Sequence, residues 1–172
     1  INISLEVVGR RDDGYHQVTT LLHQLGLADL LSFRLADGLS LKCDMPCLEN
    51  EDNLVLQAAR LLKKRTGYTL GAAMTLDKNI PVAGGLGGGS SDAAAALLGL
   101  NVLWGLGLSV DELAGIAAGL GSDVSFFLWG GTAWAQGRGE QIASLSPLPP
   151  LAVTLVFPDL AIPNKTAAMY SK

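Results

Sequence analysis

The sequence has few charged residues, no excess of basic ones and no long apolar run, and these absences exclude several classes of protein. Charged residues make up 16% of the 172 residues, and 12 basic against 16 acidic side chains give a net charge of −4. Nucleic acids and anionic membranes are held chiefly by clustered lysine and arginine, so neither is an expected partner. No run approaches the ~18 apolar residues of a membrane-spanning helix. Because 49% of the residues are hydrophobic, we expect a soluble, cytoplasmic domain with a sizeable core.

Cysteine and histidine are scarce, which argues against a structural metal centre. The two cysteines, Cys43 and Cys47, are accompanied by only two histidines, His16 and His23. Structural zinc usually takes four ligands, and neither histidine stands at a zinc-finger spacing from the cysteines. We therefore expect ordinary reduced thiols of a cytosolic protein.

The chain lacks an initiator methionine, a secretory signal and a transit-like leader. It opens within an alternating pattern over residues 1–8, which is typical of a strand already under way. It ends in a polar, helix-like segment, 164–172, with no terminator. We expect a fragment of a longer protein.

Hydrophobic periodicity and turn residues predict a mixture of strands and helices without regular alternation. A Ser109-Val110-Asp111-Glu112 capping box starts one helix, and glycine follows two others. Because the elements do not alternate as in a doubly wound sheet, we expect one domain of the α+β class. The expected strands are 1–8, 29–35, 39–43, 71–77, 132–135 and 152–157, of which 29–35 and 39–43 form a meander. The expected helices are 52–65, 92–104 and 110–120. Residues 15–22 are expected to be extended, and 124–128 is a short apolar stretch.

Glycine is unevenly distributed, and its densest cluster precedes a predicted helix. Six of the 21 glycines fall in residues 1–83, fifteen in 84–139 and none thereafter. Five occupy residues 84–89, and ordering them costs much conformational entropy. A helix beginning near Ser90 offers unpaired N–H groups and the positive end of its dipole. The segment predicts a phosphate-binding loop, to which Ser90 and Ser91 add hydroxyl groups; the alternative is a flexible loop capped by Ser91 or Asp92.

Three common nucleotide-binding motifs do not fit this segment. Gly84 and Gly89 satisfy the first half of a P-loop, but Ser90 stands where that motif has lysine. A Rossmann pattern beginning at Gly85 also fails at Ser90. The His-Arg-Asp and Asp-Phe-Gly motifs of protein kinases are absent from the sequence.

The segment Pro81-Val82-Ala83-Gly84-Gly85-Leu86-Gly87-Gly88-Gly89-Ser90-Ser91-Asp92-Ala93 resembles the ATP-binding motif of the GHMP kinase superfamily. Within it, the sequence is most similar to the 4-diphosphocytidyl-2-C-methyl-D-erythritol kinases. The similarity extends over essentially the whole chain and includes Arg11–His16, Glu51–Leu54 and Gly121–Phe127. It implies the α+β fold of the family's N-terminal ATP-binding domain, also found in ribosomal proteins and translation factors.

The resemblance assigns a role to Asp123, which matches the family's catalytic aspartate that takes or orients the proton of the acceptor hydroxyl. Without the family, the position of Asp123 before an apolar stretch favours a simple helix N-cap. The resemblance also implies that Pro81 to Ser91 bind ATP, and it leaves the ligands of the associated Mg²⁺ open among Ser90, Ser91 and Asp92.

The resemblance places further residues around the two substrates. Asn2, Tyr15 and His16 match the acceptor pocket, where an aromatic face and a ring nitrogen meet cytosine. Asn53 and Lys78 match positions near adenine. Taken without the family, Tyr15 and His16 favour a half-buried surface pair, Asn53 a helix start and Lys78 a solvated charge.

The chain departs from the family pattern at both ends. The family pairs its aspartate with a lysine that would immediately precede Ile1. The second domain that closes over the substrate is absent apart from its beginning at 159–172. We therefore assign residues 1–158 to the ATP-binding domain.

The resemblance implies an ATP- and Mg²⁺-dependent kinase of the non-mevalonate isoprenoid pathway, acting on the 2-hydroxyl of a small molecule, cytidine-diphosphate-linked methylerythritol. Its oligomeric state is left open. The alternatives are a GHMP kinase for mevalonate-, homoserine- or sugar-type acceptors, a non-catalytic nucleotide-binding protein, and an RNA-binding domain. The net negative charge and the lack of a basic stripe disfavour the last.

Overall fold

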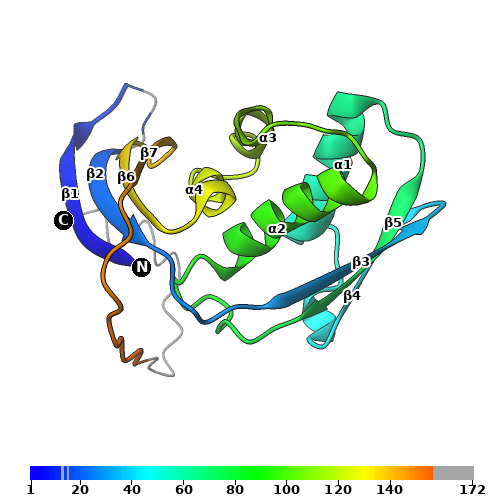
Figure 1. The fold of residues 1–172 in the computed structure, drawn as a ribbon, viewed down its shortest axis with the longest axis horizontal. Helices are drawn as coiled ribbons and strands as arrows, with labels where there is room; N and C mark the ends of the chain where they lie inside the picture. The colour runs from blue at the N-terminus through cyan, green and yellow to red at the C-terminus, as the bar shows by residue number, and fades with distance from the viewer. Residues whose placement is uncertain (13, 15, 157–172) are drawn as a thin grey trace.

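The computed structural model describes residues 1–12, 14 and 16–156, and these form two sheets with helices packed between and over them (Figure 1). The predicted α+β class is confirmed. In chain order the elements are β1 (Asn2–Arg10), β2 (His16–His23), β3 (Leu30–Ala36), β4 (Leu39–Cys43), the short 3₁₀ helix η1 (Pro46–Leu48), α1 (Leu54–Thr66), β5 (Gly71–Asp77), α2 (Gly88–Leu103), α3 (Val110–Ala117), α4 (Val124–Trp129), β6 (Thr132–Gly137) and β7 (Gln141–Leu145).

The first sheet is antiparallel in the order β1-β2-β6-β7. Strand β1 lies at its edge, and its apolar side chains Ile3, Leu5 and Val7 remain 44–48% exposed. The inner strands contribute Leu22, Ala133 and Ala135 to a small core that packs on Phe126 of α4. This sheet places the start of the chain, at Ile1, close to Asp123 in the loop before α4.

The second sheet has the order β3-β5-β4, so the predicted meander of 29–35 and 39–43 is wrong. Both segments form strands, but β5 lies between them, antiparallel to β3 and parallel to β4. The local pattern gave the strands and not their partner, because pairing depends on a segment almost thirty residues further along. The end of β5 leads directly into the glycine segment.

Helices α1 and α2 cover one face of the second sheet, α3 packs on these helices, and together they bury the main core (Figure 1). Ala93, Ala94 and Ala96 of α2 are at most 1% exposed, and these small side chains let α1 and α4 approach closely. Helix α1 begins at the predicted place with Asn53 as its N-cap, and the capping box of Ser109 and Glu112 starts α3. Helix α3 ends at Ala117 rather than at residue 120, and turns follow.

Two expectations for the C-terminal part need correction or fall outside the structure. Residues 151–156 are not in a strand, although 152–157 was predicted as one, and their apolar side chains such as Leu151 and Val156 are exposed. Instead β7, which sequence patterning missed, completes the first sheet. The expected start of a second domain at 159–172 lies outside the described residues. Within the described part of the chain, no helix combines the length and the apolar character needed to cross a membrane.

Candidate functional site

The glycine segment forms a loop that ends at the open N-terminus of α2. The helix begins at Gly88, earlier than predicted, and its N-cap is Gly87 in a left-handed conformation with φ of 71°. No side chain caps this end, and the first turn carries no acidic residue. The alternative of a loop capped by Ser91 or Asp92 is therefore wrong. The N–H groups of the first turn and the positive helix dipole are available to an anion.

A cavity of about 360 Å³ lies in front of this loop. Of the predicted nucleotide-binding residues, all but Ser91 line it: Asn53, Lys78, Pro81, Val82, Ala83, Gly84, Gly85, Leu86, Gly87, Gly88, Gly89 and Ser90. The structure thus brings together residues from the start of α1, the end of β5 and the loop. A concave site with convergent backbone N–H groups is the arrangement that binds phosphate.

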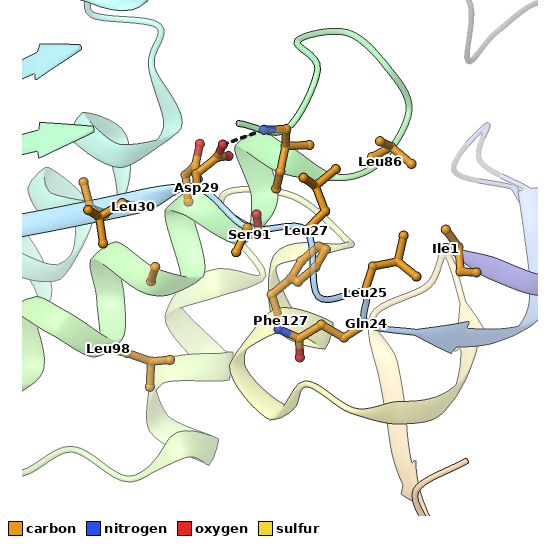
Figure 2. A pocket seen from close by; sticks show the side chains of 15 residues that line it. Ile1, Gln24, Leu25, Leu27, Asp29, Leu30, Leu86, Ser91, Leu98 and Phe127 are labelled. Carbon is orange, nitrogen blue, oxygen red and sulfur yellow. Dashed lines mark hydrogen bonds between the residues drawn. The ribbon is translucent and has the colours of Figure 1, made fainter. Parts of the chain in front are cut away.

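Ser91 lies on the other side of the loop. Its hydroxyl donates a hydrogen bond to the Gly88 carbonyl over 2.7 Å. It lines a second cavity of about 380 Å³, whose wall includes Leu27, Leu98 and Phe127 (Figure 2). The serine pair is therefore divided, and Ser90 alone faces the cavity in front of the loop.

Asn53 is the N-cap of α1, as its interpretation as a helix-start residue predicted. Its Oδ1 accepts the N–H of Val55 over 2.9 Å and so caps α1, while its amide donates to the Leu48 carbonyl over 2.9 Å. It also lines the cavity in front of the loop. The cap fixes this side chain at the mouth of the cavity.

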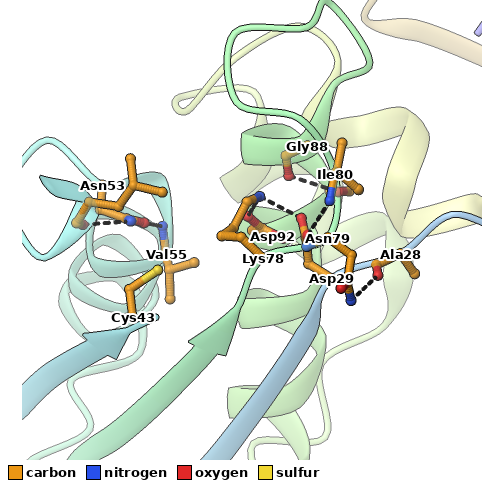
Figure 3. A network of polar contacts seen from close by, with 12 residues as sticks. Ala28, Asp29, Cys43, Asn53, Val55, Lys78, Asn79, Ile80, Gly88 and Asp92 are labelled. Carbon is orange, nitrogen blue, oxygen red and sulfur yellow. Dashed lines mark hydrogen bonds and ion pairs between the residues drawn. The ribbon is translucent and has the colours of Figure 1, made fainter. Parts of the chain in front are cut away.

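Lys78 is not the solvated charge of the alternative interpretation. Its Nζ lies 2.5 Å from Asp29 Oδ2 and 2.8 Å from Asp92 Oδ2, and the three side chains are only 5%, 3% and 8% exposed (Figure 3). Burial alone would lower the pKa of Lys78, but the two carboxylates raise it. The side chain is a buried cation with two anionic partners.

The two carboxylates of this triad titrate differently. Burial alone would raise the pKa of Asp29, but hydrogen bonds from the Ile80 N–H, Lys78 and the Asn79 N–H outweigh it and lower the pKa. For Asp92 desolvation prevails over Lys78, and its pKa rises from 3.8 to about 6. The Lys78 ammonium and two backbone N–H groups together outweigh the burial of Asp29, whereas Lys78 only partly offsets the burial of Asp92.

Replacing Asp92 by asparagine should stabilise the protein at pH 8. A carboxyl with a raised folded-state pKa favours folding most below pH 4, and this contribution is lost as the pH rises through 6. The difference between a pKa of 3.8 and one of about 6 corresponds to ~3 kcal/mol. Asparagine keeps an oxygen that accepts from Lys78. We expect Asp92→Asn to raise the unfolding free energy by about 1–3 kcal/mol at pH 8 and by less at pH 5, measured by urea unfolding. A less stable variant at pH 8 would contradict this electrostatic balance.

Asp123 occupies the N-cap position of α4 but does not cap it, because its side chain makes no cap hydrogen bond. The simple N-cap interpretation is therefore not supported. The residue is exposed toward a third cavity, of about 120 Å³, which Ile1, Asn2 and Arg138 also line. Desolvation raises the pKa of Asp123. The position immediately before Ile1, where the resemblance places a lysine, adjoins this cavity.

The glycine loop separates the Asp123 cavity from the cavity in front of α2. Gly85, Leu86 and Gly87 line both. Phe127, one turn into α4, lies against Gly87 so closely that a Cβ there would be 2.9 Å from its ring. A phosphate bound at the loop and a hydroxyl bound at Asp123 would therefore lie on either side of Gly85, Leu86 and Gly87, close to each other.

The structure separates the predicted acceptor residues. Asn2 lines the Asp123 cavity and donates to Thr20 Oγ1 over 2.8 Å, whereas His16 does not line it. In the β1–β2 hairpin Asn2 faces Leu22 and His16 faces Arg10, so the two lie at opposite ends. At ~3.3 Å per residue, eight residues of strand span roughly 26 Å. Tyr15 lies outside the described residues.

Sequence analysis missed Asp29 and Arg138, and it considered Asp92 only as a helix cap or a metal ligand. Asp29 and Asp92 were not assigned to Lys78, since nothing local links residues 29, 78 and 92. Arg138 lies in the β6–β7 turn between Gly137 and Gly139, both with positive φ, and lines the Asp123 cavity. A basic residue flanked by glycines was the available signal for Arg138.

Among the residues that the structure describes, no group of three or more His, Cys, Asp or Glu side chains is placed to hold an ion. Cys43 is buried and Cys47 exposed, and both are free thiols as predicted.

Comparison with known proteins agrees with this geometry. The family model described as GHMP kinases N terminal domain matches residues 53–131. The chain is 49% identical over 169 residues to the 4-diphosphocytidyl-2-C-methyl-D-erythritol kinase of Alcanivorax borkumensis, covering 94% of this chain and 55% of that protein. It is 46% identical to the enzyme of the same name from Listeria monocytogenes, covering 96% of this chain and 58% of that protein. The chain thus spans little more than half the length of these curated relatives.

Solved structures extend the agreement to the fold. A crystal structure of 4-(cytidine 5'-diphospho)-2C-methyl-D-erythritol kinase is similar with a TM-score of 0.77 and 37% identity, covering 100% of this chain and 62% of that one. A homoserine kinase from Cytophaga hutchinsonii, at 20% identity, shares the fold with a TM-score of 0.64 over 89% of this chain and 53% of that one. The chain belongs to the GHMP kinase family and carries its N-terminal domain.

Proposed function

We propose that this chain is the ATP-binding part of a kinase that phosphorylates the 2-hydroxyl of 4-diphosphocytidyl-2-C-methyl-D-erythritol. One observation carries the proposal: the phosphate-binding loop and the Asp123 cavity share the wall formed by Gly85, Leu86 and Gly87. A kinase needs its donor phosphate and its acceptor hydroxyl in contact, and this arrangement provides both sides.

In the proposed reaction the acceptor hydroxyl lies at Asp123, whose carboxylate takes its proton. The hydroxyl oxygen forms a bond to the γ-phosphorus of ATP, and the bond from that phosphorus to the ADP oxygen breaks. The products are ADP and the phosphorylated alcohol. The raised pKa of Asp123 makes it a stronger base than an ordinary carboxylate.

Phosphoryl transfer needs positioning and neutralisation of charge more than covalent chemistry by the protein. The open N-terminus of α2 offers N–H groups and a positive dipole, and the Ser90 hydroxyl faces the same cavity. Mg²⁺ would neutralise part of the phosphate charge when bound, with Ser90 as an oxygen ligand from this chain. Arg138 supplies a cation on the acceptor side.

The substrate assignment rests on the relatives, which carry this enzyme name at 45–52% identity. Asn2 in the Asp123 cavity and His16 at the far end of the hairpin suit an elongated acceptor, whose cytosine is separated from its reacting hydroxyl by a ribose and two phosphates. We assign Tyr15 and His16 to the cytosine, and Asn53 and Lys78 to the adenine side. The proposal retains residues 1–158 as the ATP-binding domain, 159–172 as the start of a segment toward a second domain, and a cytoplasmic location.

A panel of acceptors tests the proposal. The intact protein, assayed by coupled ADP release with MgATP, should turn over 4-diphosphocytidyl-2-C-methyl-D-erythritol and leave mevalonate, homoserine and galactose unphosphorylated. Release of ADP with one of these other acceptors would show that the protein is a GHMP kinase of another substrate class. Tight ATP binding without turnover of any acceptor would identify a non-catalytic nucleotide-binding protein.

A further inference from the structure

The buried triad of Asp29, Lys78 and Asp92 joins the two ends of the phosphate-binding loop. Lys78 follows the last residue of β5, where the loop begins, and Asp92 lies in α2, just beyond its end. Asp29 precedes β3 in a separate part of the chain. The ammonium of Lys78 contacts both carboxylates, as Figure 3 shows. A single cation thus connects β3, β5 and α2 beneath the loop.

The carboxylate of Asp29 binds backbone N–H groups at the start of the loop. Its Oδ1 accepts the N–H of Asn79 over 2.6 Å and that of Ile80 over 2.8 Å, while its Oδ2 accepts from Lys78. The Asn79 amide also donates to the Ala28 carbonyl over 3.0 Å. These bonds fix the direction in which the chain leaves β5.

The end of the loop, where α2 begins, also packs on the triad. A Cβ added to Gly88, the first residue of α2, would lie 3.0 Å from Cγ2 of Ile80 and 3.4 Å from the Nζ of Lys78. The helix therefore starts directly on the triad and on the side chain that follows it. Asp92 fastens the second turn of α2 to the same ammonium.

Between these anchors the loop has no regular structure to hold it. Ala83, Gly85 and Gly87 all have positive φ, and Ala83 at 58° is the one non-glycine residue with positive φ in the described part of the chain. A left-handed alanine is unfavourable and persists only where its surroundings impose it. The conformation of the loop therefore depends on how its ends are placed.

We propose that Asp29 and Asp92 are positioning residues for nucleotide binding, which act through Lys78 on both ends of the phosphate-binding loop. The inference rests on the proposed function, since it assumes that ATP binds at this loop. It assigns the triad no contact with the reacting atoms: its role is to place the N–H groups of the loop and of α2.

A set of paired variants of the intact protein tests the proposal by calorimetric titration with MgATP. Asp92→Asn keeps an oxygen for Lys78 and should bind ATP within about 3-fold of the parent, whereas Asp92→Ala and Asp29→Ala should weaken binding by about 10–100-fold. The KM for the acceptor should change less than the affinity for ATP, because only one wall of the Asp123 cavity, Gly85 to Gly87, belongs to the loop that the triad places. Asp111→Asn, which removes an exposed carboxylate from α3, is the matched control and should bind ATP like the parent.

Equal ATP affinity of the parent, Asp92→Ala and Asp29→Ala, each folded by circular dichroism, would overturn the proposal. Asp92→Ala leaves Lys78 paired with Asp29, so it decides the matter if Asp29→Ala does not fold. Equal weakening in Asp92→Asn and Asp92→Ala would also count against positioning, because the charge alone would then matter. A parent protein that binds no MgATP would instead refute the proposed function.

Discussion

Replacing Asp123 by asparagine should lower turnover by about 10²–10⁴-fold, the usual contribution of a positioned base. Asparagine has nearly the same shape but cannot take a proton from the acceptor hydroxyl. Its effect on folding should be small, because the Asp123 side chain makes no cap hydrogen bond in α4 and is exposed to its cavity. The measurement is kcat by coupled ADP release with both substrates saturating.

Two controls accompany this variant. Its KM for ATP should remain close to that of the parent, since Asp123 lines the acceptor cavity and not the one in front of the loop. Its melting temperature should also be unchanged within a few degrees, about the shift that 1 kcal/mol causes in a domain of this size. Turnover close to the parental rate in a folded variant would remove Asp123 from the role of base.

Replacing Gly87 by valine should raise the KM for ATP by about 100-fold or abolish activity. Gly87 is the N-cap of α2 with φ of 71°, a conformation that costs a β-branched residue of the order of 1–3 kcal/mol. Its Cβ would lie 2.9 Å from two atoms of the Phe127 ring, so the ring, the loop or α4 has to shift. Both effects displace the N–H groups that face the proposed phosphates. Steady-state kinetics with varied ATP measure the change.

The other end of α2 provides a matched control for the glycine variant. Gly105 also has a positive φ, 61°, but no atom lies within 4 Å of its added Cβ. Gly105→Val should therefore lose stability through backbone strain while its KM for ATP stays near the parental value. If Gly87→Val retained the parental response to ATP, the loop would not be the phosphate site.

Local elements were predictable from the sequence where a local interaction fixes them. The bounds of β5 agree with the alternating pattern of 71–77, and the caps at Asn53 and Ser109 start α1 and α3 as expected. The start of α2 was placed too late, because glycine is a poor helix former and the propensity of Gly88 and Gly89 argues against a helix. In the structure Ile80 and Lys78 lie so close to Gly88 that an added Cβ would be 3.0 Å and 3.4 Å from their side chains, which favours glycine there.

The candidate site was predictable in part and for the same reason. The nucleotide loop is one continuous segment, so its glycines, Ser90 and the following helix appear together in the sequence. The role of Lys78 was not predictable, because its partners Asp29 and Asp92 stand 49 and 14 residues away. The prediction of a meander was wrong for the same reason, since β5, from a distant part of the chain, lies between β3 and β4.

The sequence by itself determined that this chain has a phosphate-binding loop at a helix start, few charges and no basic surface, and which family its motifs resemble. These features depend on residue type and short spacing. Only the tertiary structure decided that the loop forms one wall of the Asp123 cavity, that Lys78 is buried between two carboxylates and that His16 lies far from Asn2. The physical reason is that burial and long-range pairing, which set both electrostatics and proximity, arise from the packing of segments that no local pattern connects.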